Sequence, residues 1–317
     1  MFLHLSDDEL AGLGITTAEA VDAVENAIRA RRQGDVRVTP KSVIEPGDGR
    51  YLMSTLGVTG APSMTVVKSV VLNPRNPPRG LSGINATIVM LDGETGILKA
   101  VMQANWITAV RTAALSAIAA RRFADPAAKR IAFVGTGAQA RAHLDTFADL
   151  YPLEEVAIAG RGRTNIDRLA AAADARGLRA RVASDPRDAL ADADIAVSSV
   201  VATYDGPPLA DARWLKPGAF ATITDLARPW DRDGMAAFDT IVIDDLEQEA
   251  AMAEPMVAPN LVAGDLDGLV NADLPSGHAP QRRSAFVFRG VAIGDLAMAA
   301  LAYARAGAAG IGQRIER

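Results

Sequence analysis

A glycine-rich segment is the part of this sequence whose residue spacing points most directly to chemistry. Residues 131–140 read IAFVGTGAQA, which places Gly135, Gly137 and Ala140 in a G-x-G-x-x-A pattern. The pattern follows an expected strand and opens an expected helix, as in a dinucleotide-binding turn. Gly135 permits the tight turn, Gly137 lets the backbone approach a pyrophosphate, and the helix N-terminus offers N–H groups to the anion. An ordinary glycine-rich strand–helix turn is the alternative.

The segment about 20 residues beyond this turn bears on which dinucleotide would bind. An NAD site usually has an acidic residue there that bonds to the ribose 2′-hydroxyl. Residues 159–164 read AGRGRT, so Arg161 and Arg163 stand where that carboxylate would be. Arginine makes charge-assisted, often bidentate contacts with phosphate, so the pair favours the 2′-phosphate of NADP(H) over NAD(H). Two arginines solvated on a loop are the alternative.

Three charged side chains outside this segment could contact a substrate. Lys68 shares a strand face with Val66 and Val70, so it lies either on a solvated edge strand or in a site. Arg111 is expected in the first turn of a helix that begins at Thr108. A cation there is unfavourable unless an anion binds or the side chain bends into water. Asp225 ends an expected strand, and a carboxylate at the carboxyl edge of a sheet is well placed for chemistry. The alternative is that Asp225 caps the next turn.

The composition of the 317-residue chain narrows the chemistry further. It has no cysteine, which excludes thiolate nucleophiles and zinc–sulfur sites, and its three histidines are too scattered for a metal site or a catalytic triad. Acid–base chemistry is therefore expected from carboxylates and from the five lysines. The net charge of -5 argues against nucleic-acid binding. Without a signal peptide or an apolar run of about 20 residues, a cytoplasmic protein with no membrane span is expected.

The elements that must position these residues follow two different sequence patterns, one on each side of residue 126. Residues 41–105 are rich in strands, with a β-branched run at 64–72 and a hairpin formed by 87–91 and 97–102 around a turn. After residue 126, short apolar runs alternate with helical stretches, which is typical of a doubly wound parallel sheet. The strand candidates there are 130–134, 156–159, 182–183, 195–198, 220–223 and 241–244. Helices are expected from 108 to 124, from 295 to 306, and from Thr16 to about residue 32, where Thr16 and Glu19 have the spacing of a capping box.

Together these segments resemble the ornithine cyclodeaminase/μ-crystallin family over nearly the whole chain. The most recognisable stretches are the Lys68 strand with Asn73-Pro74, the turn at 92–96, TAVRTAA at 108–114, VGTGAQA at 134–140 and GVAIGDLA at 290–297. The resemblance implies an α/β fold in which a Rossmann domain, a doubly wound parallel sheet at 119–290, is inserted into a mixed α+β domain. That second domain, 1–118 plus 291–317, would bind substrate and form a homodimer.

The resemblance also implies roles for particular residues. The family handles a carbon–nitrogen bond next to a carboxylate. Its substrate-binding lysine, carboxylate-binding arginine and catalytic aspartate match Lys68, Arg111 and Asp225, and Lys41 is the best match to a further basic residue. Clustered cations should lower the pKa of Lys68, which would let it donate a proton as well as anchor the substrate. The expected dinucleotide contacts are Gly135, Thr136, Gly137, Ala138, Gln139, Arg161, Arg163, Thr112, Ser199 and Thr222.

Departures from the family pattern favour one activity within it. Cyclodeaminases carry a glutamate where this sequence has Tyr51, and their reaction recycles a tightly held NAD, which the arginine pair does not fit. We expect an NAD(P)H-dependent reductase of an α-imino acid, a cyclic ketimine such as pyrroline- or piperideine-2-carboxylate. Asp225 would contact the imine nitrogen. The alternatives are an ornithine cyclodeaminase, an alanine-type amino-acid dehydrogenase and a non-enzymatic NADPH-dependent binding protein of the μ-crystallin type.

Overall fold

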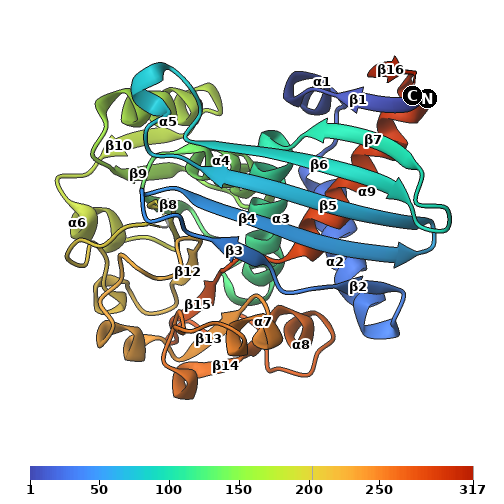
Figure 1. The fold of residues 1–317 in the computed structure, drawn as a ribbon. Helices are drawn as coiled ribbons and strands as arrows, with labels where there is room; N and C mark the ends of the chain where they lie inside the picture. The colour runs from blue at the N-terminus through green and yellow to red at the C-terminus, as the bar shows by residue number, and fades with distance from the viewer. Residues whose placement is uncertain (202, 317) are drawn as a thin grey trace. The chain divides into compact units, whose positions relative to one another are not determined.

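The computed structural model describes residues 1–201 and 203–316, and the chain divides into two compact units (Figure 1). The first unit contains Met1–Leu115 and Val291–Arg317, and the second contains Ser116–Gly290. The expected domain limits, after residues 118 and 290, lie within three residues of these boundaries. Each unit is built around an eight-stranded sheet of its own.

The sheet of the first unit has strand order β16-β1-β7-β6-β5-β4-β2, with β3 paired to β4. Its strands are β1 (Phe2–Leu5), β2 (Val36–Val38), β3 (Ser42–Ile44), β4 (Tyr51–Gly60), β5 (Ser63–Leu72), β6 (Ile84–Asp92), β7 (Leu98–Gln103) and β16 (Gln313–Ile315). The predicted hairpin is confirmed as the antiparallel pair β6 and β7. β5 lies between β4 and β6, so the interpretation of Lys68 as a residue on a solvated edge strand is wrong.

Helices α1 (Asp7–Ala11), α2 (Thr17–Gln33) and α9 (Ala292–Ala309) belong to the first unit, with the short 3-10 helix η1 (Pro77–Arg79). The predicted capping box is confirmed, because the Thr16 side chain accepts from the Glu19 backbone N–H and the Glu19 side chain accepts from the Thr16 backbone. Helix α9 contacts β4, β5 and α2, and both helices lie behind the sheet in Figure 1. One face of the sheet is thereby covered.

Helix α3 (Asn105–Phe123) begins three residues earlier than predicted. The Thr108 hydroxyl donates to the Ala104 carbonyl, 2.6 Å away, and does not cap the helix. The N-terminal turn is satisfied instead by Asp7, whose carboxylate accepts from the Trp106 N–H at 2.8 Å. Arg111 therefore lies in the second turn of α3, and the prediction that it lies in the first turn, beside the positive end of the helix, is wrong.

The second unit contains the predicted doubly wound sheet, in which all neighbouring strands are parallel. The strand order is β10-β9-β8-β11-β12-β15-β13-β14. The strands are β8 (Arg130–Val134), β9 (Glu155–Ala159), β10 (Arg179–Val182), β11 (Ile195–Ser198), β12 (Phe220–Ile223), β13 (Thr240–Ile243), β14 (Val262–Asp265) and β15 (Ser284–Val287). The sequence analysis did not predict β14 and β15.

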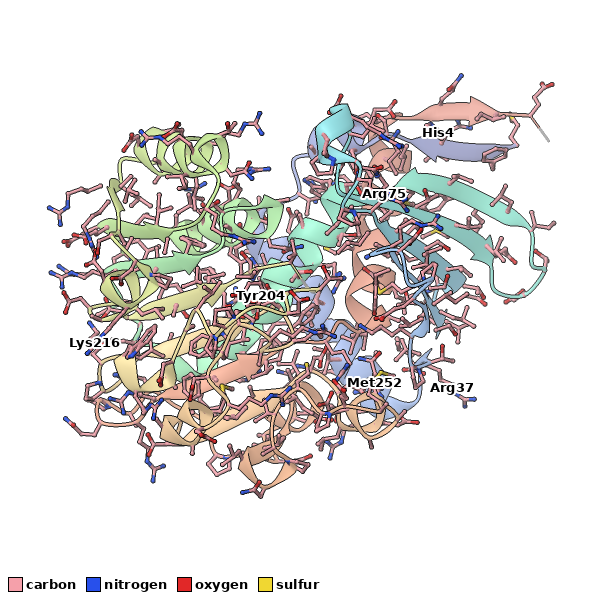
Figure 2. All side chains as sticks on the ribbon, turned by 60° about the vertical axis from the view of Figure 1, so that its left-hand side comes forward. His4, Arg37, Arg75, Tyr204, Lys216 and Met252 are labelled. Carbon is pink, nitrogen blue, oxygen red and sulfur yellow. The ribbon has the colours of Figure 1, made fainter. Side chains whose placement is uncertain are left out.

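The helices of the second unit are α4 (Ala138–Leu150), α5 (Arg163–Ala175), α6 (Pro186–Leu190), α7 (Leu246–Ala250) and α8 (Leu266–Val270), with 3-10 helices η2 (Ala212–Trp214), η3 (Gly234–Ala237) and η4 (Pro259–Leu261). The inner strands β8, β9, β11, β12, β13 and β15 are almost entirely buried, as a parallel sheet covered on both faces requires, whereas the edge strands β10 and β14 are partly exposed. Figure 2 shows charged side chains such as Lys216 extending outward from the ribbon. Among the helices described, none is long and apolar enough to cross a membrane.

Candidate functional site

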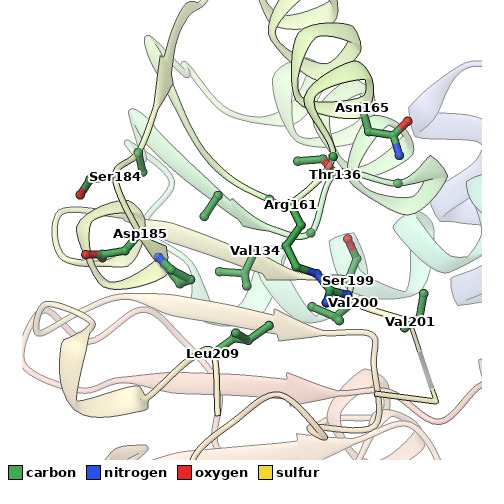
Figure 3. Close-up of a pocket in the computed structure, with 17 residues that line it drawn as sticks. Val134, Thr136, Arg161, Asn165, Ser184, Asp185, Ser199, Val200, Val201 and Leu209 are labelled. Atoms are coloured by element: carbon green, nitrogen blue, oxygen red, sulfur yellow. The ribbon is translucent and has the colours of Figure 1, made fainter. Parts of the chain in front are cut away.

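A cavity of about 440 Å³ lies in the second unit, where the strand order reverses beside β8 (Figure 3). Four segments at the carboxyl ends of strands line most of it: 134–137 after β8, 159–162 after β9, 183–186 after β10 and 199–201 after β11. Ligands of open α/β sheets bind at such a topological switch point. The cavity is therefore the candidate dinucleotide site.

The turn between β8 and α4 fits a pyrophosphate. Gly135 has a φ of 98°, and a Cβ there would lie 2.5 Å from the Ser199 carbonyl oxygen, so only glycine is accommodated. Gly137 is the N-cap of α4 and provides no side-chain cap. A Cβ at Gly137 would meet nothing within 4 Å, so the N-terminus of α4 opens onto space in which an anion could lie.

The structure separates the two arginines that the sequence treats as a pair. Arg161 lines the cavity, and Figure 3 shows its side chain extending in the direction of Ser199 and Val200. Within the described residues Arg161 takes part in no ion pair. Arg163 is different: its side chain is 83% exposed and pairs with Asp167 one helical turn further along α5, at 2.9 Å. Of these two arginines, only Arg161 is placed to contact a ligand in this cavity.

The other expected dinucleotide contacts also divide into two groups. Thr136 and Ser199 line the cavity with the two glycines, and the buried Ser199 hydroxyl has no hydrogen-bond partner in the part of the chain described. Ala138 and Gln139 open α4 but do not line the cavity. Thr112 lies in the first unit, where its hydroxyl donates to the Thr108 carbonyl at 2.7 Å.

Thr222 is fully buried and belongs to a hydrogen-bonded chain in the core of the second unit. Its hydroxyl donates to Ser116 at 2.8 Å, and Ser116 lies 2.8 Å from Nε2 of His143. Nδ1 of His143 lies 2.7 Å from the Gln139 carbonyl, which can only accept, so the proton is on Nδ1. Burial lowers the pKa of His143 to about 4, which fits this neutral ring. Thr222 thus ties β12 to α3 and α4.

Asp225 follows β12 and is fully buried. Its Oδ2 accepts from the Ser198 hydroxyl and, at 3.0 Å, from the Val200 N–H, whereas Oδ1 has no hydrogen bond to any described residue. Burial raises the pKa of Asp225 to about 6, and the hydrogen bonds from Ser198 and Val200 oppose that rise. The carboxylate is thus held by one oxygen and can change its charge near neutral pH.

The backbone after Asp225 has an uncommon conformation. Leu226 and Ala227 have φ values of 62° and 54°, in the left-handed region that side chains with a Cβ disfavour. Such residues cost on the order of 1–3 kcal/mol each and persist where the surroundings enforce them, often at functional sites. The sequence contains no glycine here that would have signalled the turn.

In the first unit, Lys68 and Arg111 meet at a buried carboxylate, Asp295. Lys68 Nζ lies 2.8 Å from Asp295 Oδ1, and Arg111 Nε lies 2.9 Å from the same oxygen. The three side chains are at most 4% exposed. Lys41 is also buried, and its ammonium group lies 5.8 Å from the centroid of the Tyr51 ring. The three basic residues singled out from the sequence are therefore all buried in one unit.

The electrostatics of this cluster follow from burial and charge. Burial lowers the pKa of Lys68 to about 8, the nearby cations Arg111 and Lys41 lower it too, and Asp295 raises it. A lysine of this kind is charged at neutral pH yet close enough to its pKa to release a proton. The cluster can bind a carboxylate and take part in proton transfer.

Sequence reasoning did not assign a role to Asp295. The signal was present, because Asp295 is the one acidic residue in an otherwise apolar helical stretch, IGDLAMAALAYA at 293–304. A carboxylate buried in such a helix requires a cation or several hydrogen bonds.

In the described residues no group of histidine, aspartate or glutamate side chains could hold a metal ion.

The fold and the cavity define a Rossmann-type α/β protein with a crevice at the switch point of its parallel sheet. The chain belongs to the ornithine cyclodeaminase/mu-crystallin family, which it matches over residues 8–309. The resemblance inferred from the motifs is thereby confirmed.

Individual relatives are similar over most of their length. Ketimine reductase mu-crystallin of Mus musculus is 30% identical over 69% of this chain and 68% of its own. The structure of Thermococcus litoralis Δ1-pyrroline-2-carboxylate reductase with NADH and L-proline has a TM-score of 0.91, at 24% identity, over 99% of this chain and all of its own. An archaeal alanine dehydrogenase dimer with bound NAD has a TM-score of 0.88, at 24% identity, over 99% of both chains. The names of these relatives are those of oxidoreductases.

Proposed function

We propose that this protein is an NAD(P)H-dependent reductase of α-imino acids, with a cyclic ketimine such as pyrroline- or piperideine-2-carboxylate as substrate. The observation that carries the proposal is the buried cluster of Lys68 and Arg111, which suits a carboxylate-bearing substrate. The cavity at the switch point of the second unit's sheet and the 30% identity to a ketimine reductase support it.

The proposed roles follow from charge and hydrogen bonding. Lys68 and Arg111, with Lys41, bind the substrate carboxylate. Reduction of a C=N bond requires a hydride at carbon and a proton at nitrogen, and the dinucleotide supplies the hydride when bound. Asp225 in its ionised form contacts the imine nitrogen through Oδ1 and stabilises the protonated imine, which is the better hydride acceptor. Lys68 in its charged form can also supply a proton.

The proposal is tested by following NADPH and NADH absorbance at 340 nm with a panel of cyclic imino acids, keto acids plus amines, and controls. We expect depletion of the reduced cofactor with pyrroline- or piperideine-2-carboxylate. Formation of proline and ammonia from ornithine without added nucleotide would identify a cyclodeaminase instead, and NAD-dependent oxidation of alanine would identify a dehydrogenase. A flat trace across the whole panel would favour a non-enzymatic binding protein.

For the cofactor we propose a preference for NADP(H), based on Arg161. We expect Arg161→Ala to raise the Kd for NADPH by about 10–100-fold, since hydrogen bonds between charged groups contribute about 1.5–3 kcal/mol. The Kd for NADH should change by less than about threefold, because it has no 2′-phosphate. Titration of nicotinamide fluorescence measures both constants.

Arg163→Ala is the matched control, because it removes the same charge two residues away from Arg161. The Arg163 side chain is solvated and pairs with Asp167. It should leave both dissociation constants unchanged. Equal loss of NADPH and NADH affinity in Arg161→Ala, or a larger effect in Arg163→Ala, would rule out Arg161 as the residue that selects the cofactor.

We also propose a homodimer formed through the sheet face opposite to α2 and α9. That face presents Leu56 and Val58, which are 40% and 37% exposed, with the partly buried Val67, Val89 and Val101 beside them on neighbouring strands. Apolar patches of this kind mark interaction surfaces. Light scattering should give twice the chain mass of 33.2 kDa for the wild type. A Val67→Glu variant should shift towards the monomer, and a wild type that stays monomeric at micromolar concentration would refute the dimer.

A further inference from the structure

The carboxylate of Asp295 has a position that packing alone does not require. Its Oδ1 contacts both Lys68 Nζ and Arg111 Nε, and its Oδ2 lies 3.4 Å from the Thr55 hydroxyl, which donates to it. The preceding residue, Gly294, favours this close approach, because a Cβ there would lie 3.2 Å from Cδ of Arg111, which is tighter than an ordinary van der Waals contact. The first turn of helix α9 therefore lies close against α3, and Asp295 contacts Arg111 there.

We infer that Asp295 is a positioning residue of the proposed substrate-binding cluster: it holds Lys68 and Arg111 on one oxygen atom and keeps Lys68 in its ammonium form. This inference rests on the proposed function only in taking the cluster as the place where a substrate carboxylate binds. Asp295 itself is not proposed to touch the substrate.

The physical argument concerns what would happen to Lys68 without this carboxylate. A fully buried lysine favours its neutral form, because desolvation penalises the charge. Arg111 on α3 and Lys41 before β3 act in the same direction by repulsion. Asp295 on α9 is the acidic group that opposes them, whereas Thr55 on β4 is uncharged. A neutral Lys68 would lose most of its attraction for a carboxylate.

The positions of the Lys68 and Arg111 side chains also depend on their contacts with Asp295. Lysine and arginine side chains have many rotamers, and fixing each costs entropy. When both cations lie against one carboxylate oxygen, the separation of the two side chains is fixed before any substrate arrives, which lowers the cost of binding. Asp295→Asn keeps an amide oxygen that can accept from Lys68 but removes the negative charge, so it separates electrostatics from shape.

The test uses the small number of lysines. In protein labelled with [13Cε]lysine, the five lysines give five sets of side-chain signals, and each Cε shift reports the charge of its own amine. Lys68→Arg identifies the Lys68 signal. We expect that signal to titrate near pH 8 in the wild type and about 1–3 units lower in Asp295→Asn, the range for loss of an opposite charge within about 4–6 Å.

Controls and a second readout make the result decisive. The Lys129 signal, on an exposed side chain paired with Glu154, should titrate alike in all variants. Thr55→Val removes the hydroxyl that donates to Asp295 but no charge, so Lys68 should titrate close to its wild-type value. Asp295→Glu restores the charge and should restore the titration in part. In kcat/KM profiles, the alkaline limb of Asp295→Asn should move to lower pH together with the NMR titration.

A folded Asp295→Asn protein in which Lys68 still titrates near pH 8 overturns the inference, even if its stability is reduced, because only a structural role would then remain. If Asp295→Asn does not fold, Asp295→Ser, a smaller neutral variant, provides the same test. The NMR result does not depend on turnover. A shifted titration in a protein that reduces no imino acid would therefore support the inference about Asp295 while refuting the proposed reductase activity.

Discussion

Lys68→Met should lower kcat/KM for a cyclic imino acid by about 10²–10³-fold, mostly through a higher KM. The reason is that a buried ammonium group bonded to a substrate carboxylate is lost, and breaking a buried ion pair by removal of one partner costs on the order of 3–5 kcal/mol. Methionine matches the length of the lysine stem, so β5 should still pack between β4 and β6. Initial rates with NADPH over a range of imino acid concentrations measure the effect.

Two comparisons show whether the loss arises from substrate binding. Lys129→Met removes a lysine whose side chain is 58% exposed, and it should leave kcat and KM unchanged. The Kd for NADPH should be the same in Lys68→Met as in the wild type, because the residues that line the proposed nucleotide cavity belong to the second unit. Near-normal turnover by Lys68→Met would contradict the assignment of Lys68 as the substrate anchor.

Asp225→Asn should lower kcat by about 10²–10³-fold, the usual size of the effect when one group that stabilises transition-state charge is removed. The loss should appear in kcat rather than in KM, because the ionised carboxylate raises the fraction of bound imine that is protonated, and the protonated imine is the form that accepts hydride. Asparagine keeps the shape and can still accept from Ser198 and Val200. Single-turnover measurements with bound NADPH separate the chemical step from cofactor release.

The pH dependence provides a sharper test of the same assignment. Burial raises the pKa of Asp225 to about 6, so its carboxylate is protonated, and the reaction slowed, as the pH falls below that value. Burial lowers the pKa of Lys68 to about 8, so its charge, and with it carboxylate binding, is lost as the pH rises above that value. The profile of kcat/KM should be bell-shaped with limbs near these values.

Three variants should each change one limb of that profile. Asp225→Asn should lose the acidic limb and keep the alkaline one, whereas Lys68→Arg should keep the acidic limb and lose the alkaline one, since arginine stays charged. Ser198→Ala should move the acidic limb to higher pH, because it removes a hydrogen bond that favours the ionised Asp225. An unchanged acidic limb in Asp225→Asn would show that another group titrates there.

Features that depend on neighbouring residues were predictable from the sequence. The capping box of Thr16 and Glu19, the hairpin of β6 and β7, and the strand–turn–helix at Gly135 are present as expected. In each case the hydrogen bonds or the backbone torsions involve residues of one continuous short segment of the chain. The alternation of apolar runs also indicated the parallel sheet, because a strand buried on both faces must be apolar throughout.

The sequence could not distinguish residues of the same type whose surroundings differ. Arg161 and Arg163 are two positions apart, yet one lines the cavity and the other pairs with Asp167 in solvent. Lys68 could have been on an edge strand, and only the pairing of β5 on both sides excludes this. The start of α3 at Asn105 depends on Asp7, which is 99 residues from the Trp106 N–H that it accepts from.

The sequence by itself determined that this chain has no cysteine, three histidines and five lysines, and it singled out Lys68, Arg111 and Asp225 as candidate site residues. Tertiary structure decided how those groups are charged and held. Lys68 and Asp295 are 227 residues apart along the chain and 2.8 Å apart in space. The state of the lysine depends on that contact, because burial and Coulomb interactions are set by distance in the folded protein, not by spacing in the sequence.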